Sequence, residues 1–137
     1  MSPTQAEFGS WQSPITTELL TSQTVGLSEP RLDGDRVYWL ESRPWEKGRN
    51  VLVEYTDGVS KDLLPKPINV RTQVHEYGGD CYCVLEDRII FALFDDQRLY
   101  SIDSRDKNAN PEALTDEGPW RYADFCPDLQ HNRLICV

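Results

Sequence analysis

The nine residues Arg71–Gly79, read Arg-Thr-Gln-Val-His-Glu-Tyr-Gly-Gly, hold the densest group of functional side chains in the sequence. Arg71, His75, Glu76 and Tyr77 offer a cation, a titratable ring, a carboxylate and a hydroxyl group. Such a set can bind a small ligand: Glu76 would pair with an ammonium group, and Arg71 or His75 would hold a carbonyl oxygen. The same residues can instead join two neighbouring structural units, with the two glycines turning the chain into the next strand. Because polar contacts between such units are routine, the structural interpretation is favoured.

The sequence on both sides of this stretch alternates between short strand-like runs and tight turns. Asp33-Gly34 and Asp57-Gly58 are hairpin-turn signatures, and each is followed by a run of strand length. A second set of runs begins at Gly79, and Arg88–Phe94 is the most apolar among them. Strands joined by such short turns are antiparallel. The sequence therefore predicts an all-β chain.

A five-residue motif occurs three times, at Asp35–Trp39, Asp87–Phe91 and Asn132–Cys136, with the form Asp or Asn, then Arg, then three apolar residues. The copies begin 52 and 45 residues apart. A repeat of about 40–50 residues with four strands per unit is typical of a β-propeller blade. We therefore predict a partial β-propeller of about two and a half four-stranded blades, with a single β-sandwich as the alternative.

These repeats divide the chain into an N-terminal arm with a short helix over residues 1–27, a first blade over 28–68, a second blade over 69–117 and the truncated start of a third blade over 118–137. The helix is predicted over Thr16–Ser22, with Thr16 as its N-cap. Because propellers close with about 4–8 blades, we expect the chain to be part of a longer protein. Its open blade edges would then favour self-association.

The chain is acidic, with a formal net charge of −9 at pH 7 over 137 residues. Nucleic-acid binding depends on clustered Lys and Arg side chains, so neither a nucleic-acid nor an anionic-membrane partner is predicted. No apolar run approaches the roughly 20 residues that span a bilayer, and residues 1–7 lack the features of a secretory signal. We therefore expect a cytoplasmic protein.

Three further groups of residues are interpreted as structural. The four cysteines are expected to be reduced, buried thiols, the usual fate of cysteine in a reducing compartment. The acidic pairs Asp33/Asp35 and Asp95/Asp96 lack the spacing of a calcium loop, so no metal or cofactor is predicted. Trp120 is expected to lie in the core.

Several motifs stand in an order that resembles a known family: Phe8–Ile15, Asp33–Trp39, Glu41–Pro44, Gly48–Asn50, Asn69–Gly79 and Asp95–Tyr100. They resemble the N-terminal portion of prolyl oligopeptidase-type serine peptidases, in the branch of bacterial dipeptidyl and acylaminoacyl peptidases. The resemblance covers residues 8–137, and the motifs around Trp11 and His75 are its most specific parts.

The resemblance implies an open, seven-bladed propeller that covers an α/β-hydrolase domain and filters peptides by size. The serine–aspartate–histidine triad of that family lies in the hydrolase domain, and this chain has no Gly-x-Ser-x-Gly motif. No catalytic residue is therefore expected here. Trp11 and Ile15 would pack against the hydrolase domain, and Glu76 would bind the α-amine of a short peptide substrate.

The favoured hypothesis is a propeller portion that gates and positions peptide substrates for a hydrolase domain absent from this chain. The alternative is a non-catalytic propeller that serves as a protein-interaction scaffold. A serine-nucleophile motif encoded downstream would favour the peptidase, whereas further blades alone would favour the scaffold.

Overall fold

The computed structural model describes residues 5–10, 13–21, 24–106 and 108–137. The first sheet consists of β1 (Gly26–Asp33), β2 (Arg36–Arg43), β3 (Arg49–Thr56) and β4 (Val59–Asp62). The second sheet consists of β5 (Tyr82–Leu85), β6 (Arg88–Ala92), β7 (Leu99–Asp103) and β8 (Glu112–Ala113). A hairpin of β9 (Cys126–Asp128) and β10 (Arg133–Ile135) follows. The helical segments are α1 (Thr17–Thr21) and the 3-10 turns η1 (Pro44–Glu46), η2 (Val74–Glu76) and η3 (Leu129–His131).

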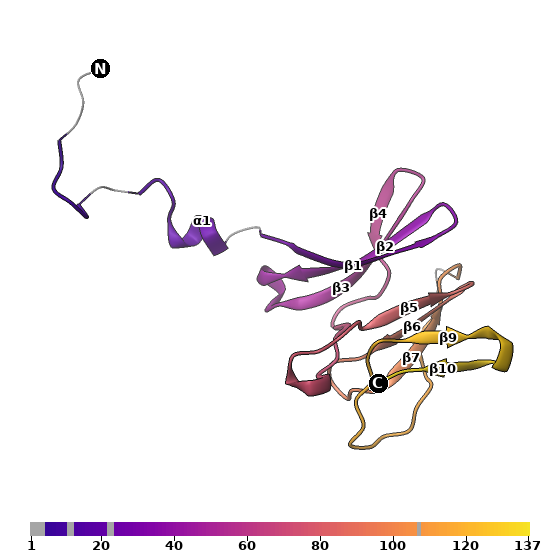
Figure 1. Ribbon diagram of the computed structural model, residues 1–137. Helices are drawn as coiled ribbons and strands as arrows, with labels where there is room; N and C mark the ends of the chain where they lie inside the picture. The colour runs from indigo at the N-terminus through magenta and orange to yellow at the C-terminus, as the bar shows by residue number, and fades with distance from the viewer. Residues whose placement is uncertain (1–4, 11–12, 22–23, 107) are drawn as a thin grey trace.

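The two four-stranded sheets are neighbouring blades of a partial β-propeller. Each is antiparallel with its strands in chain order, and the first strands of successive units, β1, β5 and β9, lie next to one another (Figure 1). The Asp/Asn-Arg motif opens β2, β6 and β10, the second strand of each unit. The structure thus confirms the predicted fold class.

The core lies between the two blades. Along β2, Tyr38 and Leu40 are fully buried against the second blade, while Trp39 between them points to the other side and is partly exposed, as the two-residue period of a strand requires. From the second blade, Ile89 and Phe91 fill the same core. Complete burial of each such side chain contributes about 1.5–3 kcal/mol. The burial of these side chains between the blades therefore stabilises the pair.

In the third unit, the first strand, β9, begins only at Cys126. Asp124, two residues earlier, takes a left-handed backbone conformation (φ 57°) that interrupts an extended strand. The prediction of buried cysteines is correct for Cys81 and Cys83 and wrong for Cys126, which is exposed; Cys136 is only half-buried.

Trp120 also departs from the prediction, since its side chain is 66% exposed instead of lying in the core. Its indole ring lies over Gly118, where a Cβ atom would come within 2.8 Å of the ring carbon Cδ1. The connection from β8 to β9 therefore carries this tryptophan on the surface.

The described residues before β1, which are 5–10, 13–21 and 24–25 and which we call the arm, extend away from the blades (Figure 1). Its helix α1 confirms the predicted start, because the Thr16 hydroxyl accepts a hydrogen bond from the Leu19 amide at 3.1 Å. Trp11 and Ser22, which the sequence singled out, lie outside the described residues. Among the described residues, no helix is long and apolar enough to cross a membrane.

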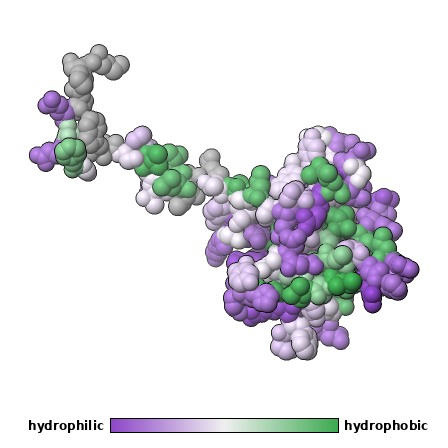
Figure 2. All heavy atoms as spheres, viewed as in Figure 1, coloured by the Kyte–Doolittle hydropathy of each residue, from purple (hydrophilic) through white to green (hydrophobic). Residues whose placement is uncertain are grey.

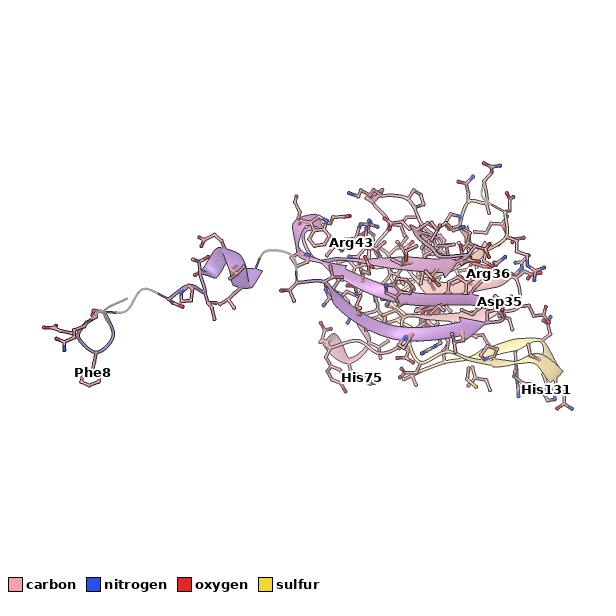
Figure 3. The ribbon with its side chains drawn as sticks, turned by 90° about the horizontal axis from the view of Figure 1, so that it is seen from above. Phe8, Asp35, Arg36, Arg43, His75 and His131 are labelled. Carbon is pink, nitrogen blue, oxygen red and sulfur yellow. The ribbon has the colours of Figure 1, made fainter. Side chains whose placement is uncertain are left out.

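Because each blade has four antiparallel strands, the chain returns to the same end of the blades after every unit. Figure 3 shows Arg43 and His75 at the end nearest the arm, and Asp35, Arg36 and His131 at the opposite end. We call the first end the arm face; it carries the arm and the connections 44–48, 63–81, 93–98 and 114–125. The other end, which carries the hairpin turns, is the turn face.

Candidate functional site

The Arg71–Gly79 stretch forms part of the connection between β4 and β5 on the arm face. Its residues Thr72 and Val74 are buried, and they hold the stretch to the blades. His75, Glu76 and Tyr77 follow them and are exposed. Arg71, at the start of the stretch, is exposed as well, so all four predicted site residues reach solvent from a fixed base.

The backbone of this loop is strained at the residues that carry the chemistry. His75 and Glu76 both have positive φ angles, 53° and 67°, in a region that costs non-glycine residues about 1–2 kcal/mol each. Gly78, with φ 91°, then lets the chain turn, and its amide donates to the Val74 carbonyl at 2.8 Å. Strain of this kind persists only where surrounding contacts fix the backbone.

One such contact is an ion pair with the third unit. Arg121, in the connection between β8 and β9, places Nη1 2.5 Å from Glu76 Oε1 and donates to the Gln73 carbonyl at 3.0 Å. The carboxylate of Glu76 thus joins two units, as the structural interpretation of this stretch expects. Both side chains are exposed, so the pair contributes roughly 0–1 kcal/mol to stability.

The remaining predicted residues separate into two places. The rings of His75 and Tyr77 stack, with centroids 5.8 Å apart and an interplanar angle of 26°, and Tyr77 is 85% exposed. The guanidinium of Arg71 lies instead over the ring of Phe94, 5.4 Å from its centroid. The loop therefore offers an open aromatic pair beside a neutralised carboxylate, while Arg71 contacts a different connection.

Arg121 is the site residue that the motif analysis missed. It lies 45 residues from Glu76 in the sequence, so no local pattern links the two. The signal that was present is topological: the connections before β5 and before β9 occupy equivalent positions in successive blades, and both must lie on the arm face.

A second polar cluster joins the innermost strands. A bulge in β1 interrupts its pairing with β2 after Ser28, and Glu29 there has φ 52°. The Glu29 carboxylate accepts the Cys81 amide at 2.7 Å, and the Tyr82 hydroxyl donates to the Glu29 carbonyl at 2.6 Å. Burial raises the pKa of Glu29 above its ordinary value and raises that of the Cys81 thiol to about 12. These groups are held in place and kept from reacting.

The described residues hold no group of three or more His, Cys, Asp or Glu side chains suited to binding a metal ion. The arm face carries exposed aromatic rings, a carboxylate and a guanidinium on a rigid base.

Comparison with known proteins decides what this propeller piece is similar to. A puromycin-hydrolyzing peptidase of Mycobacterium tuberculosis shares 34% sequence identity with the chain, with a TM-score of 0.84 over 98% of the chain and 22% of the peptidase. The chain is similar to the propeller region of puromycin-hydrolyzing peptidases. A puromycin hydrolase matches at 32% identity and a TM-score of 0.80, over 96% of the chain and 22% of the hydrolase. A mutant of puromycin hydrolase complexed with PGG matches at 33% identity and a TM-score of 0.79, over 94% of the chain and 21% of the mutant.

The chain spans about a fifth of the length of each of these structures. No protein-family model and no curated protein sequence matches it. The likeness to these peptidases of the prolyl oligopeptidase family favours a peptidase-associated propeller over the interaction scaffold.

Proposed function

We propose that the chain forms the first blades of a propeller that covers the active site of a serine peptidase and positions short peptides for a hydrolase domain outside this chain. The sequence identity to puromycin-hydrolyzing peptidases supports this proposal. The dipeptidyl and acylaminoacyl branch of the family is proposed on the sequence motifs alone, and the cytoplasm is the proposed location.

The observation that carries the proposal is that the arm and the His75 loop share one face. Phe8 is fully exposed on the arm, and Ile15 and Leu20 are more than half exposed. Figure 2 shows hydrophobic residues gathered on the segment that carries α1. An apolar segment of this kind gains stability only by packing on another surface. A hydrolase domain held by the arm would face the His75 loop directly.

On this face, the stacked rings of His75 and Tyr77 would contact the substrate, and Glu76 would share its carboxylate between Arg121 and the substrate amine. Arg71 would act at the edge of the site, because its guanidinium already lies over Phe94. The role of the loop is binding and orientation; the covalent chemistry would belong to the hydrolase domain.

The first test is the length of the native product, measured as an intact mass from the source organism, together with the coding sequence beyond the Val137 codon. We expect a product several times longer, with a Gly-x-Ser-x-Gly motif and then Asp and His encoded downstream. A product that ends at Val137, or one that adds only further blades, would overturn the peptidase proposal.

The second test uses that native product and puromycin as the substrate. Tyr77→Ala should raise KM about tenfold with little change in kcat, because the lost contact binds the substrate without taking part in bond cleavage. Tyr55→Ala is the matched control, since Tyr55 is an exposed aromatic residue of the first blade outside the loop. Equal KM values for the parent and the Tyr77 variant would exclude a substrate contact there.

The open blade edges carry a further proposal about partners. Chains produced without the remaining blades should associate through β9 and β10 and the apolar residues around them, among them Leu129 and Ile135. Size-exclusion chromatography at increasing concentration tests this, and a monomer at every concentration would contradict it.

A further inference from the structure

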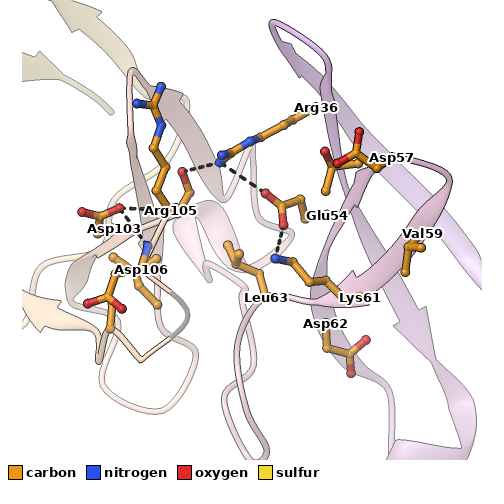
Figure 4. A pocket seen from close by; sticks show the side chains of 14 residues that line it. Arg36, Glu54, Asp57, Val59, Lys61, Asp62, Leu63, Asp103, Arg105 and Asp106 are labelled. Atoms are coloured by element: carbon orange, nitrogen blue, oxygen red, sulfur yellow. Dashed lines mark hydrogen bonds and ion pairs between the residues drawn. The ribbon is translucent and has the colours of Figure 1, made fainter.

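On the turn face, away from the His75 loop, a groove of about 620 Å³ separates the outer parts of the two blades. Figure 4 shows β3 and β4 of the first blade on one side and the segment around Asp103–Asp106 of the second blade on the other. Apolar side chains, Val59, Leu63 and Ile102, form part of its lining. The groove is thus a second inter-blade feature that the peptide-positioning role does not use.

A buried carboxylate lines this groove. The side chain of Glu54 is 1% exposed, and its Oε1 accepts a hydrogen bond from the Tyr38 hydroxyl at 3.2 Å and lies 3.4 Å from Arg36 Nη1. The other oxygen, Oε2, receives no hydrogen bond of good geometry from the described residues. It forms an ion pair with Lys61 Nζ at 2.6 Å (Figure 4). One oxygen is therefore held by the blade, and the other is satisfied only by a primary ammonium group.

The ammonium group belongs to Lys61, whose side chain can move away from Glu54. Lys61 lies on β4, the edge strand, whose four residues are all exposed, and its side chain is 44% exposed. Lysine is a flexible point charge that binds carboxylates without the fixed geometry of arginine. Arg36, by contrast, is also bound to Ser104 of the second blade at 3.2 Å. Only Lys61 can swing into solvent without breaking a contact between the blades.

The second blade shows that a carboxylate is not needed at this position for a blade to form. Tyr38 pairs with Glu54 between β2 and β3, and Ile90 pairs with Ser101 between β6 and β7. The two pairs occupy equivalent positions, because Tyr38 and Ile90 each lie two residues after the arginine that opens their strand. Ser101 therefore takes the place of Glu54, and the buried charge is specific to the groove between the blades.

We propose that this groove binds primary aliphatic amines, with the ligand ammonium replacing Lys61 Nζ at Glu54 Oε2. The apolar lining suits an alkyl chain. Asp57 and Asp106 also line the groove, where they would attract a second ammonium group at the other end of that chain. The shared chemistry is a primary ammonium group on an alkyl chain. It can come from an aliphatic diamine, which also supplies the second ammonium group, or from the side chain of a lysine, which does not. Among the residues that the structure describes, five acidic and three basic side chains line the groove, and this balance disfavours an anion.

The test is calorimetric titration of the full chain with 1,4-diaminobutane at neutral pH and low salt. Lys61→Ala removes the internal competitor and should tighten binding about tenfold, whereas Glu54→Gln should weaken it about tenfold or more, the effect of losing a charge-assisted hydrogen bond. Glu112→Gln is the control for a Glu-to-Gln change outside the groove: Glu112 lies on β8 and pairs with Ser101, in the position that Lys61 takes beside Glu54. It should bind like the parent.

Two further measurements keep the proposal falsifiable if Glu54→Gln fails to fold. The diamine should raise the Tm of Lys61→Ala more than that of the parent, because a ligand that binds only the folded state stabilises it. Butane-1,4-diol, which has the same length and no charge, should raise the Tm of neither chain. A blocked peptide with one lysine distinguishes the sources: tighter binding than the diamine assigns the site to polypeptides.

If neither the parent nor Lys61→Ala binds the diamine, the proposal is overturned and the Arg36–Glu54–Lys61 group is a structural contact. Equal binding by the Glu54→Gln and parent chains would also overturn it, because the amine would then be held by general negative charge.

Discussion

Replacing Tyr82 by phenylalanine tests how the two blades are joined at their innermost strands. The ring of Tyr82 is buried in the core, and its hydroxyl donates a 2.6 Å hydrogen bond to the carbonyl of Glu29 in the other blade. That carbonyl lies in the β1 bulge, where the pairing with β2 is interrupted. Tyr82→Phe keeps the ring and removes this bond alone.

The expected loss follows from the burial of Tyr82 and the partial burial of Glu29. An acceptor left without its donor in such surroundings costs about 1–3 kcal/mol. Unfolding entropy of about 2.1 cal/mol/K per residue gives about 0.29 kcal/mol/K for 137 residues. The Tm should therefore fall by about 3–10 °C.

Thermal unfolding followed by circular dichroism measures this loss, with Tyr100→Phe as the matched control. The Tyr100 hydroxyl donates to Asp96 at 2.7 Å on the surface, where water can replace the lost partner, so its removal should cost less than about 1 kcal/mol. Equal losses for the two variants, or no loss for Tyr82→Phe, would refute the claim that the bulge carbonyl depends on Tyr82.

Three further predictions concern thiols, pH and the loop. Cys126, which is exposed, should react with a maleimide at pH 8 in the native chain, whereas Cys83, whose thiol pKa burial raises to about 11, should react only on unfolding; mass spectrometry of the labelled peptides distinguishes them. Burial raises the pKa of Glu29 above 4.5, so the contribution of this carboxyl to stability is fully present below pH 4.5 and is lost as pH rises through the folded pKa. Glu29→Gln should therefore gain stability relative to the parent between pH 4 and neutrality, and parallel pH profiles of the two chains in urea unfolding would contradict this. A double-mutant cycle with Glu76→Gln and Arg121→Ala should give a coupling free energy below about 1 kcal/mol, and a larger value would show that the pair is shielded from water.

The strand pattern of this protein could be predicted because its signals are local. The Asp/Asn-Arg motif marks the turn that enters the second strand of each unit, and hydrophobic alternation then decides which side chains of β2 face the next blade. The same local logic gave the N-cap of α1 at Thr16. These features depend on residues only a few positions apart.

The rest depends on contacts between distant residues. The left-handed backbone at His75 and Glu76 has no sequence signature, since only surrounding contacts make it tolerable for residues other than glycine. The partner of Glu76 comes from the next unit, and the pairing of Glu54 with Arg36 and Lys61 depends on strand register. The types of the residues in 71–79 pointed to this loop, but they did not identify Arg121 as the cation that neutralises Glu76.

The even number of strands in each blade has a practical consequence for anyone who labels or extends this protein. Material added at a hairpin turn is carried at the opposite end of the strands from the arm and the His75 loop. The turn at Gly34 is suited to this use, because its φ of 58° is already that of a tight turn and no atom lies within 4 Å of the place a Cβ would take. A fluorophore or affinity tag inserted there would report on the blades while leaving the recognition surface unobstructed.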